Sequence, residues 1–121
     1  MYMDSKKLIE IAARAADDLK AENIQLIQIE KVSSLADWIL ISEGLSDVQV
    51  RSIIKSIEDK LDEEANILPL RKEGVNEGKW ALLDYGDIII NVFQPKERKY
   101  YELESFWSNG NTIKYSNDLE K

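Results

Sequence analysis

The stretch of sequence that decides the fold is WALLDYGDIIINVFQ, residues 80–94. Two apolar runs, Trp80–Asp84 and Asp87–Gln94, flank the dipeptide Tyr85-Gly86. Short apolar runs bounded by turn residues are typical of strands, and Gly86 can adopt the positive φ angle that a tight hairpin requires. The stretch therefore predicts two strands joined by a short turn.

Two amphipathic helices are predicted upstream of this hairpin. The first can be capped by Asp4 or Ser5 and runs to about Ala21. Asn23, a residue that tolerates the left-handed conformation found after helices, ends it. The second opens at Ser46, and Ser46 and Gln49 together fit the capping-box pattern. Its apolar stripe repeats at helical spacing and consists of Val50, Ile53, Ile57 and Leu61.

Three further strands complete the predicted sheet. Residues 24–31 alternate without showing which phase is buried, and residues 37–43 are apolar enough to be buried on both faces. Residues 66–70 fit an edge strand because Pro69 lacks an amide donor, and the polar residues 71–79 are predicted to form a loop. Strands and helices do not alternate strictly, so the expected class is α/β (α+β), a mixed β-sheet flanked by helices.

The C-terminal part is predicted to contain a closing helix and then a tail. Pro95 favours the first turn of a helix that runs from Lys96 to about Trp107. Residues 109–121 show weak periodicity and many polar side chains, so we expect a flexible tail there. Residues 1–108 are then expected to form a single domain.

The composition excludes several kinds of catalytic and metal site and favours one kind of partner. The 121 residues include no Cys and no His, which removes disulfides, thiolate metal sites, Ser–His and Cys–His catalysis and the commonest zinc ligand. The net charge of −7 disfavours binding to bare nucleic-acid phosphates and favours binding to a basic protein, although acidity also serves solubility.

No apolar run approaches the ~20 residues that span a bilayer. We expect a cytoplasmic protein, although a protein of an organelle stroma would have the same features.

Two clusters have a possible chemical role. Asp84 and Asp87 flank the predicted turn, where Asp is common for structural reasons; they could also form an acidic patch for a partner or, on weaker grounds, hold Mg²⁺. Gly44-Leu45-Ser46 precedes a helix, where a phosphate could bind, but a single Gly without a Gly-rich motif favours a structural turn.

Aromatic residues gather in the last third of the chain. Exposed aromatic side chains beside carboxylates are the usual composition of a protein-binding hot spot. Tyr100 and Tyr101 are neighbours on the predicted closing helix and point in different directions, so at least one of them is expected to be partly exposed. The candidate partner-binding residues are Trp80, Asp84, Tyr85, Asp87, Tyr100, Tyr101 and Glu104.

The same C-terminal stretch resembles the signature of the Iojap-like ribosomal silencing factors. The matching residues are Gly78–Pro95, Arg98, Tyr101–Glu104 and Trp107, with an earlier block at Ala36-Asp37-Trp38, Gly44, Ser46 and Gln49. The resemblance extends over about residues 5–108. Two positions depart from it: Asn91 stands where many members have His, and Leu45 replaces a small hydroxyl residue.

The resemblance implies a nucleotidyltransferase-like fold that lacks the catalytic acids, and a non-enzymatic binding protein without a cofactor. It implies that the free protein is a homodimer. It also implies that the partner is the fourteenth protein of the large ribosomal subunit. Binding there would prevent the small subunit from docking. Two alternatives stay open: a Mg²⁺-dependent nucleotidyltransferase-like enzyme that uses Asp37, Gly44 and Ser46, and a purely structural dimeric module.

Overall fold

The computed structural model describes residues 3–30, 34–101 and 111–115. Within these ranges the chain forms three helices and six strands. In chain order they are α1 (Ser5–Asp18), β1 (Glu22–Gln28), β2 (Trp38–Glu43), α2 (Asp47–Ala65), β3 (Arg71–Glu73), β4 (Trp80–Asp84), β5 (Ile88–Phe93), α3 (Pro95–Tyr101) and β6 (Asn111–Lys114).

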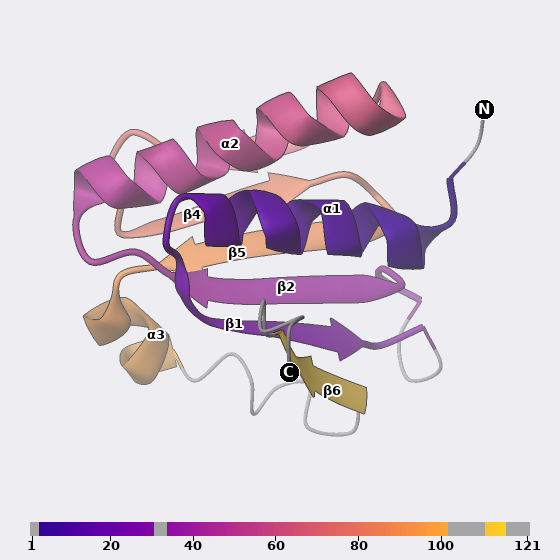
Figure 1. Ribbon diagram of the computed structural model, residues 1–121. Helices are drawn as coiled ribbons and strands as arrows, with labels where there is room; N and C mark the ends of the chain where they lie inside the picture. Colours follow the sequence, from indigo (N-terminus) through magenta and orange to yellow (C-terminus); the bar gives the residue numbers. More distant parts are fainter. Residues whose placement is uncertain (1–2, 31–33, 102–110, 116–121) are drawn as a thin grey trace, which may run out of the picture.

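All six strands belong to one mixed sheet in the order β3-β4-β5-β2-β1-β6. The central strands β2 and β5 are parallel to each other, and every other neighbouring pair is antiparallel. Helices α1 and α2 lie side by side across one face of the sheet (Figure 1). The predicted fold class is therefore confirmed, whereas the likeness to nucleotidyltransferases stays a prediction.

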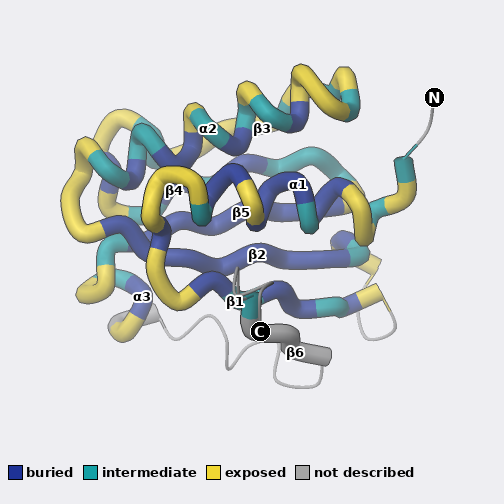
Figure 2. Tube along the Cα trace, viewed as in Figure 1, coloured by how far each residue is buried: buried dark blue, intermediate teal, exposed yellow. Residues whose placement is uncertain are grey.

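The core has one layer on each face of the sheet. In β1, Ile24 and Leu26 face α1 and α2, while Ile27, together with Ile29 just after the strand, faces the opposite side, which settles the phase that the sequence left open. Every residue of β2 and β5 is buried, as expected for the two central strands (Figure 2). Burial on both faces explains why these two segments are almost continuously apolar.

The end of α1 differs from the prediction. The helix stops at Asp18, and Lys20, with a φ angle of 64°, is the residue in the left-handed conformation after it. Asn23 also has a positive φ angle, 51°, but it lies inside β1, where the pairing register with β2 shifts between Glu22 and Gln25. Asn tolerates a positive φ in a β-bulge as well as after a helix, so local preference could not separate the two.

The start of α2 follows the predicted capping pattern with one change. Ser46 Oγ accepts a hydrogen bond from the Gln49 amide at 3.1 Å, as a capping box requires. For the reciprocal bond, the Gln49 side-chain oxygen accepts from the amide of Leu45 at 2.7 Å rather than from that of Ser46. Gly44 packs so closely on α2 that an added Cβ would lie 3.0 Å from the Val50 side chain. The turn at Gly44-Leu45-Ser46 is therefore explained by packing and capping.

The predicted edge strand was wrong in its position. Residues 66–70 are not a strand, and the edge strand β3 lies in the segment predicted to be a loop. Asn66, with a φ angle of 57°, caps α2, and Ile67 still bonds back to the helix, so the chain reaches β4 only at Leu70. At the other edge, β6 pairs with β1, so residues 111–114 of the predicted tail belong to the sheet.

Candidate protein-binding surface

Strand β4 presents a half-buried surface on the face of the sheet opposite α1 and α2. Its residues alternate: Ala81 and Leu83 are buried beneath the helices, whereas Trp80, Leu82 and Asp84 are only partly buried on the other side. This alternation is the ordinary consequence of strand geometry. It places two candidate residues, Trp80 and Asp84, on one face and adds Leu82, which the sequence analysis did not select.

Trp80 is held in a defined orientation. Its ring stacks on Phe93, its cross-strand neighbour, with ring centroids 4.8 Å apart and planes inclined by 25°. Its indole N–H donates a hydrogen bond to the side-chain oxygen of Asn91 at 3.0 Å, and Asn91 is buried. A partly exposed aromatic side chain fixed in this way loses little conformational entropy when a partner covers it.

Asp84 has a structural role in the hairpin. One carboxylate oxygen accepts a hydrogen bond from the Gly86 amide at 2.8 Å, and the other lies 3.5 Å from the guanidinium of Arg71. Gly86 has a φ angle of 91°, as the turn prediction requires. Asp84 therefore has the structural role in the turn that was considered for it. A quarter of its side chain is still exposed and could contact a partner.

Asp87 lies on the exposed side of the same turn. Its main-chain oxygen accepts hydrogen bonds from the amides of Asp37 and Trp38 at 2.8 and 3.3 Å, which ties the hairpin to the start of β2. Its side chain is exposed. In the part of the chain that the structure describes, no three acidic side chains come together to hold a metal ion.

Tyr85 lies on the opposite side of the sheet from Trp80. Its ring packs against the helix-side core, and its hydroxyl is buried without a hydrogen-bond partner among the described residues. Burial raises the pKa of Tyr85 above its ordinary value, and the nearby carboxylates of Glu58 and Asp62 raise this pKa further. The hydroxyl is therefore protonated at neutral pH, and removing the ring would leave a cavity beneath α2.

The remaining candidates lie in or after α3. Tyr100 and Tyr101 are its last two residues, and the structure describes their backbone only. Glu104 lies outside the described residues. These three positions therefore stay predictions.

Arg98 connects α3 to the sheet and is a residue that the sequence analysis did not select. Its guanidinium donates hydrogen bonds to the main-chain oxygen of Asn23 at 2.7 Å and to the Glu43 carboxylate at 3.2 Å. Arg98 and Glu43 are only 5% and 9% exposed. An Arg among exposed charges on a predicted helix has no sequence signal of burial, because its partners lie 55 and 75 positions away.

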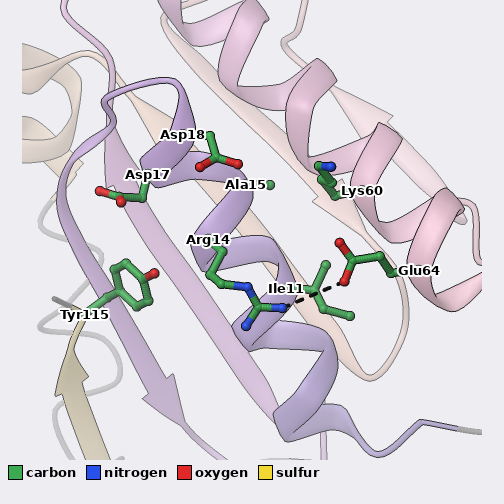
Figure 3. Close-up of a pocket in the computed structure, with 8 residues that line it drawn as sticks. All are labelled: Ile11, Arg14, Ala15, Asp17, Asp18, Lys60, Glu64 and Tyr115. Atoms are coloured by element: carbon green, nitrogen blue, oxygen red, sulfur yellow. Dashed lines mark ion pairs between the residues drawn. The ribbon is translucent and has the colours of Figure 1, made fainter. Parts of the chain in front are cut away.

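A cavity of about 170 Å³ lies on the helix side of the protein (Figure 3). It is lined by Ile11, Arg14, Ala15, Asp17, Asp18, Lys60, Glu64 and Tyr115. Arg14 and Glu64 form an ion pair across it at 3.8 Å, and both side chains are about half exposed. The two cations and three carboxylates largely offset one another, so this cavity offers little net attraction to a ligand of either charge.

Known proteins match this chain over nearly its whole length. A family model described as "Ribosomal silencing factor during starvation" matches residues 2–121. A protein from Bacillus subtilis described as ribosomal silencing factor RsfS is 42% identical over 107 residues, which is 88% of this chain and 90% of the relative. Plant proteins described as Iojap are also among its relatives.

Two solved structures share the fold. One, of a protein from Chromobacterium violaceum, has a TM-score of 0.84 and 28% identity, and the match covers 98% of each chain. The other, from Bacillus halodurans, has a TM-score of 0.78 and 34% identity over 92% of this chain and all of that one. Among the described residues, no helix has both the length and the apolar character needed to cross a membrane.

Proposed function

This chain belongs to the family of ribosomal silencing factors, and on that premise we propose that it binds the fourteenth protein of the large ribosomal subunit and keeps the small subunit from docking. The observation on which the proposal rests is the family match, which spans residues 2–121 and so includes the whole candidate surface. The resemblance stated from the hairpin sequence is confirmed by it and by the relatives.

The β4 surface has the physical properties that such binding needs. Trp80 and Leu82 offer partly exposed apolar area next to the carboxylates of Asp84 and Asp87. Aromatic anchors that become fully covered supply most of the binding energy in protein interfaces, while charges around them steer the encounter. The net charge of −7 attracts a basic partner and disfavours direct contact with ribosomal RNA.

Silencing by this route needs occupancy and no catalysis. An interface of ordinary size, about 800 Å² on each partner, would cover the β4 surface and exclude another protein from the same place. The protein is accordingly proposed to be a non-enzymatic regulator without a cofactor. The free protein is proposed to be a homodimer, as its family resemblance implies.

The test is sedimentation with separated ribosomal subunits, followed by a subunit-joining assay. The wild-type protein should co-sediment with large subunits alone and reduce the yield of joined ribosomes. Trp80→Ala should weaken this association by roughly tenfold or more, because it removes the central aromatic anchor. Val48→Ala, at an exposed apolar position on α2, is the matched control and should bind like the wild type.

Two outcomes would refute the proposal. One is an absence of wild-type protein from the large-subunit fraction even at low salt, where charge attraction is strongest. The other is association that leaves the yield of joined ribosomes unchanged. Circular dichroism of Trp80→Ala is needed beside the binding assay, since the lost stacking on Phe93 also affects stability.

A further inference from the structure

A short segment between α2 and β3 contains the two most exposed large apolar side chains of the described residues. Leu68 and Leu70 are 69% and 76% exposed, and Pro69 separates them. Leu68 precedes Pro69 and is therefore restricted to extended backbone. Residues 67–70 are here called the leucine strap. Its two exposed leucines lie only two positions apart, so they offer apolar area close together on the surface.

The leucine strap is held in place at both ends. The Ile67 amide bonds to the main-chain oxygen of Leu61 at 3.4 Å, and the Ile67 side chain packs against the helix-side core. The Leu70 amide donates to the main-chain oxygen of Asp84 at 2.7 Å. A Cβ built on Gly86 would lie 3.4 Å from a methyl carbon of Leu70, so the strap lies against the hairpin turn. Its leucines are thus presented to solvent by fixed backbone.

The helix that leads into the strap creates a negative environment. The last turn of α2 has no basic residue, and Asp62, Glu63 and Glu64 are all exposed. The C-terminal end of a helix also has a partial negative charge, which cations stabilise. Lys60 lies 3.7 Å from Glu63 and Arg14 lies 3.8 Å from Glu64, so two of the three carboxylates are partly offset.

The hairpin on the other side of the strap is acidic as well. Asp84 is paired with Arg71, whereas the Asp87 side chain is exposed at the turn. The amide of Asp37 bonds to the main-chain oxygen of Asp87, which brings the loop containing Leu35, 58% exposed, to the same end of the sheet. Leu35 and the exposed Asp87 carboxylate therefore lie at the end of the sheet where the strap meets the hairpin turn.

We propose that the leucine strap is a docking site for a basic protein segment that also has apolar side chains. Leu68 and Leu70 would supply the apolar contact, and Asp62 and Asp87 would attract the cationic side chains. Nucleic acid and anionic membranes would be repelled by the same carboxylates, and a second copy would bring two acidic surfaces together. Apart from Asp87, which borders both surfaces, the site is separate from the Trp80 face of β4, and it does not depend on the proposed ribosomal function.

The test is methyl NMR of the full chain with a defined peptide of about twelve residues in which Lys and Leu alternate. The methyl signals of Leu68 and Leu70 should shift on titration. A peptide with Ser in place of Leu and one with Asp in place of Lys should each bind at least roughly tenfold more weakly, because each lacks one of the two required properties.

A pair of double variants supplies the matched control. Leu68→Ser with Leu70→Ser should reduce affinity for the Lys-Leu peptide by roughly tenfold and leave the melting temperature unchanged, because both side chains are exposed. Leu45→Ser with Val48→Ser alters residues of similar exposure, 61% and 62%, at the other end of α2 and should bind like the wild type.

Several results would overturn the proposal. One is an equal loss of peptide affinity in the two double variants. Another is a set of peptide-induced shifts at Leu45 and Val48 that match those at the strap. A third is the absence of any shift at Leu68 and Leu70. Strap signals that respond to dilution of the protein alone would assign the surface to a second copy. Strap signals that respond to a single-stranded RNA oligonucleotide would assign it to nucleic acid.

Discussion

Breaking the buried Arg98–Glu43 pair should destabilise the protein far more than breaking an exposed pair of the same length. Arg98→Met leaves the Glu43 carboxylate buried without its cation and frees the Asn23 carbonyl that Arg98 also binds. The control is Lys55→Met, which removes the partner of Asp59. Both ion pairs are 3.2 Å long, but the side chains of Lys55 and Asp59 are 78% and 54% exposed, against 6% and 12% for Arg98 and Glu43.

The difference in burial sets the magnitudes. Removing one member of a buried pair typically costs about 3–5 kcal/mol, because the remaining charge has lost both water and its partner. An exposed pair four residues apart on a helix contributes only about 0.3–0.5 kcal/mol. Since a domain of this size is stable by about 5–15 kcal/mol, Arg98→Met should remove a large part of its stability and Lys55→Met almost none.

Urea denaturation followed by far-ultraviolet circular dichroism measures both free energies of unfolding. The double variant Arg98→Met with Glu43→Leu should recover part of the loss, because it no longer buries an unpaired carboxylate. The reasoning is refuted if Arg98→Met costs no more than Lys55→Met. It is equally refuted if the double variant loses as much stability as Arg98→Met and Glu43→Leu lose together when each is measured alone.

Three further predictions concern the hairpin and the loop that precedes it. Tyr85→Phe removes a buried hydroxyl without a described partner, so the free energy of unfolding near neutral pH should stay within about 1 kcal/mol of the wild type or rise. Because the pKa of Tyr85 is raised on folding, wild-type stability is fully present below the unfolded pKa of about 10 and falls at higher pH; this contribution should be absent from Tyr85→Phe in denaturation curves across that range. Gly78→Ala should cost about 1–3 kcal/mol or more in thermal denaturation, because Gly78 has a φ angle of 68° and its Cβ would lie 2.7 Å from the backbone of Asp47; an unchanged melting temperature would contradict this. Asp87→Lys, at an exposed position, should weaken large-subunit binding and flatten its salt dependence while the fold is retained, and equal co-sedimentation at low and high salt for both proteins would exclude a role for this charge.

Much of the fold could be predicted because the interactions involved are local. The capping of α2 by Ser46 and the turn at Gly86 depend on residues within three positions of each other, and both were found as predicted. The nearly continuous apolar run of residues 37–43 predicted a strand buried on both faces, and β2 is such a strand. Where two local solutions are equally good, as for the positive φ of Asn23, the sequence alone did not distinguish them.

The candidate surface was only partly predictable. The seven selected residues are aromatic or acidic side chains from the last third of the chain, but strand alternation separates Trp80 and Asp84 from Tyr85, which lies beneath α2. Period-two alternation could have suggested that separation, and it could have indicated Asn91 as a polar residue in need of a partner within an apolar strand. Which face α1 and α2 cover depends on packing between distant segments, so it was not evident from the sequence.

By itself the sequence determined the two long helices, the strands β1, β2, β4 and β5, the mixed class of the sheet and the family, because periodicity, capping and a contiguous signature are properties of neighbouring residues. The two edge strands, β3 and β6, were not predicted. Only the tertiary structure decided which groups meet across long separations. Arg98 joins Glu43 and Asn23, and the leucine strap comes to lie against the turn at Gly86. Such contacts depend on how the helices and strands pack together, because bringing residues so far apart in the chain together costs conformational entropy that the rest of the fold must offset.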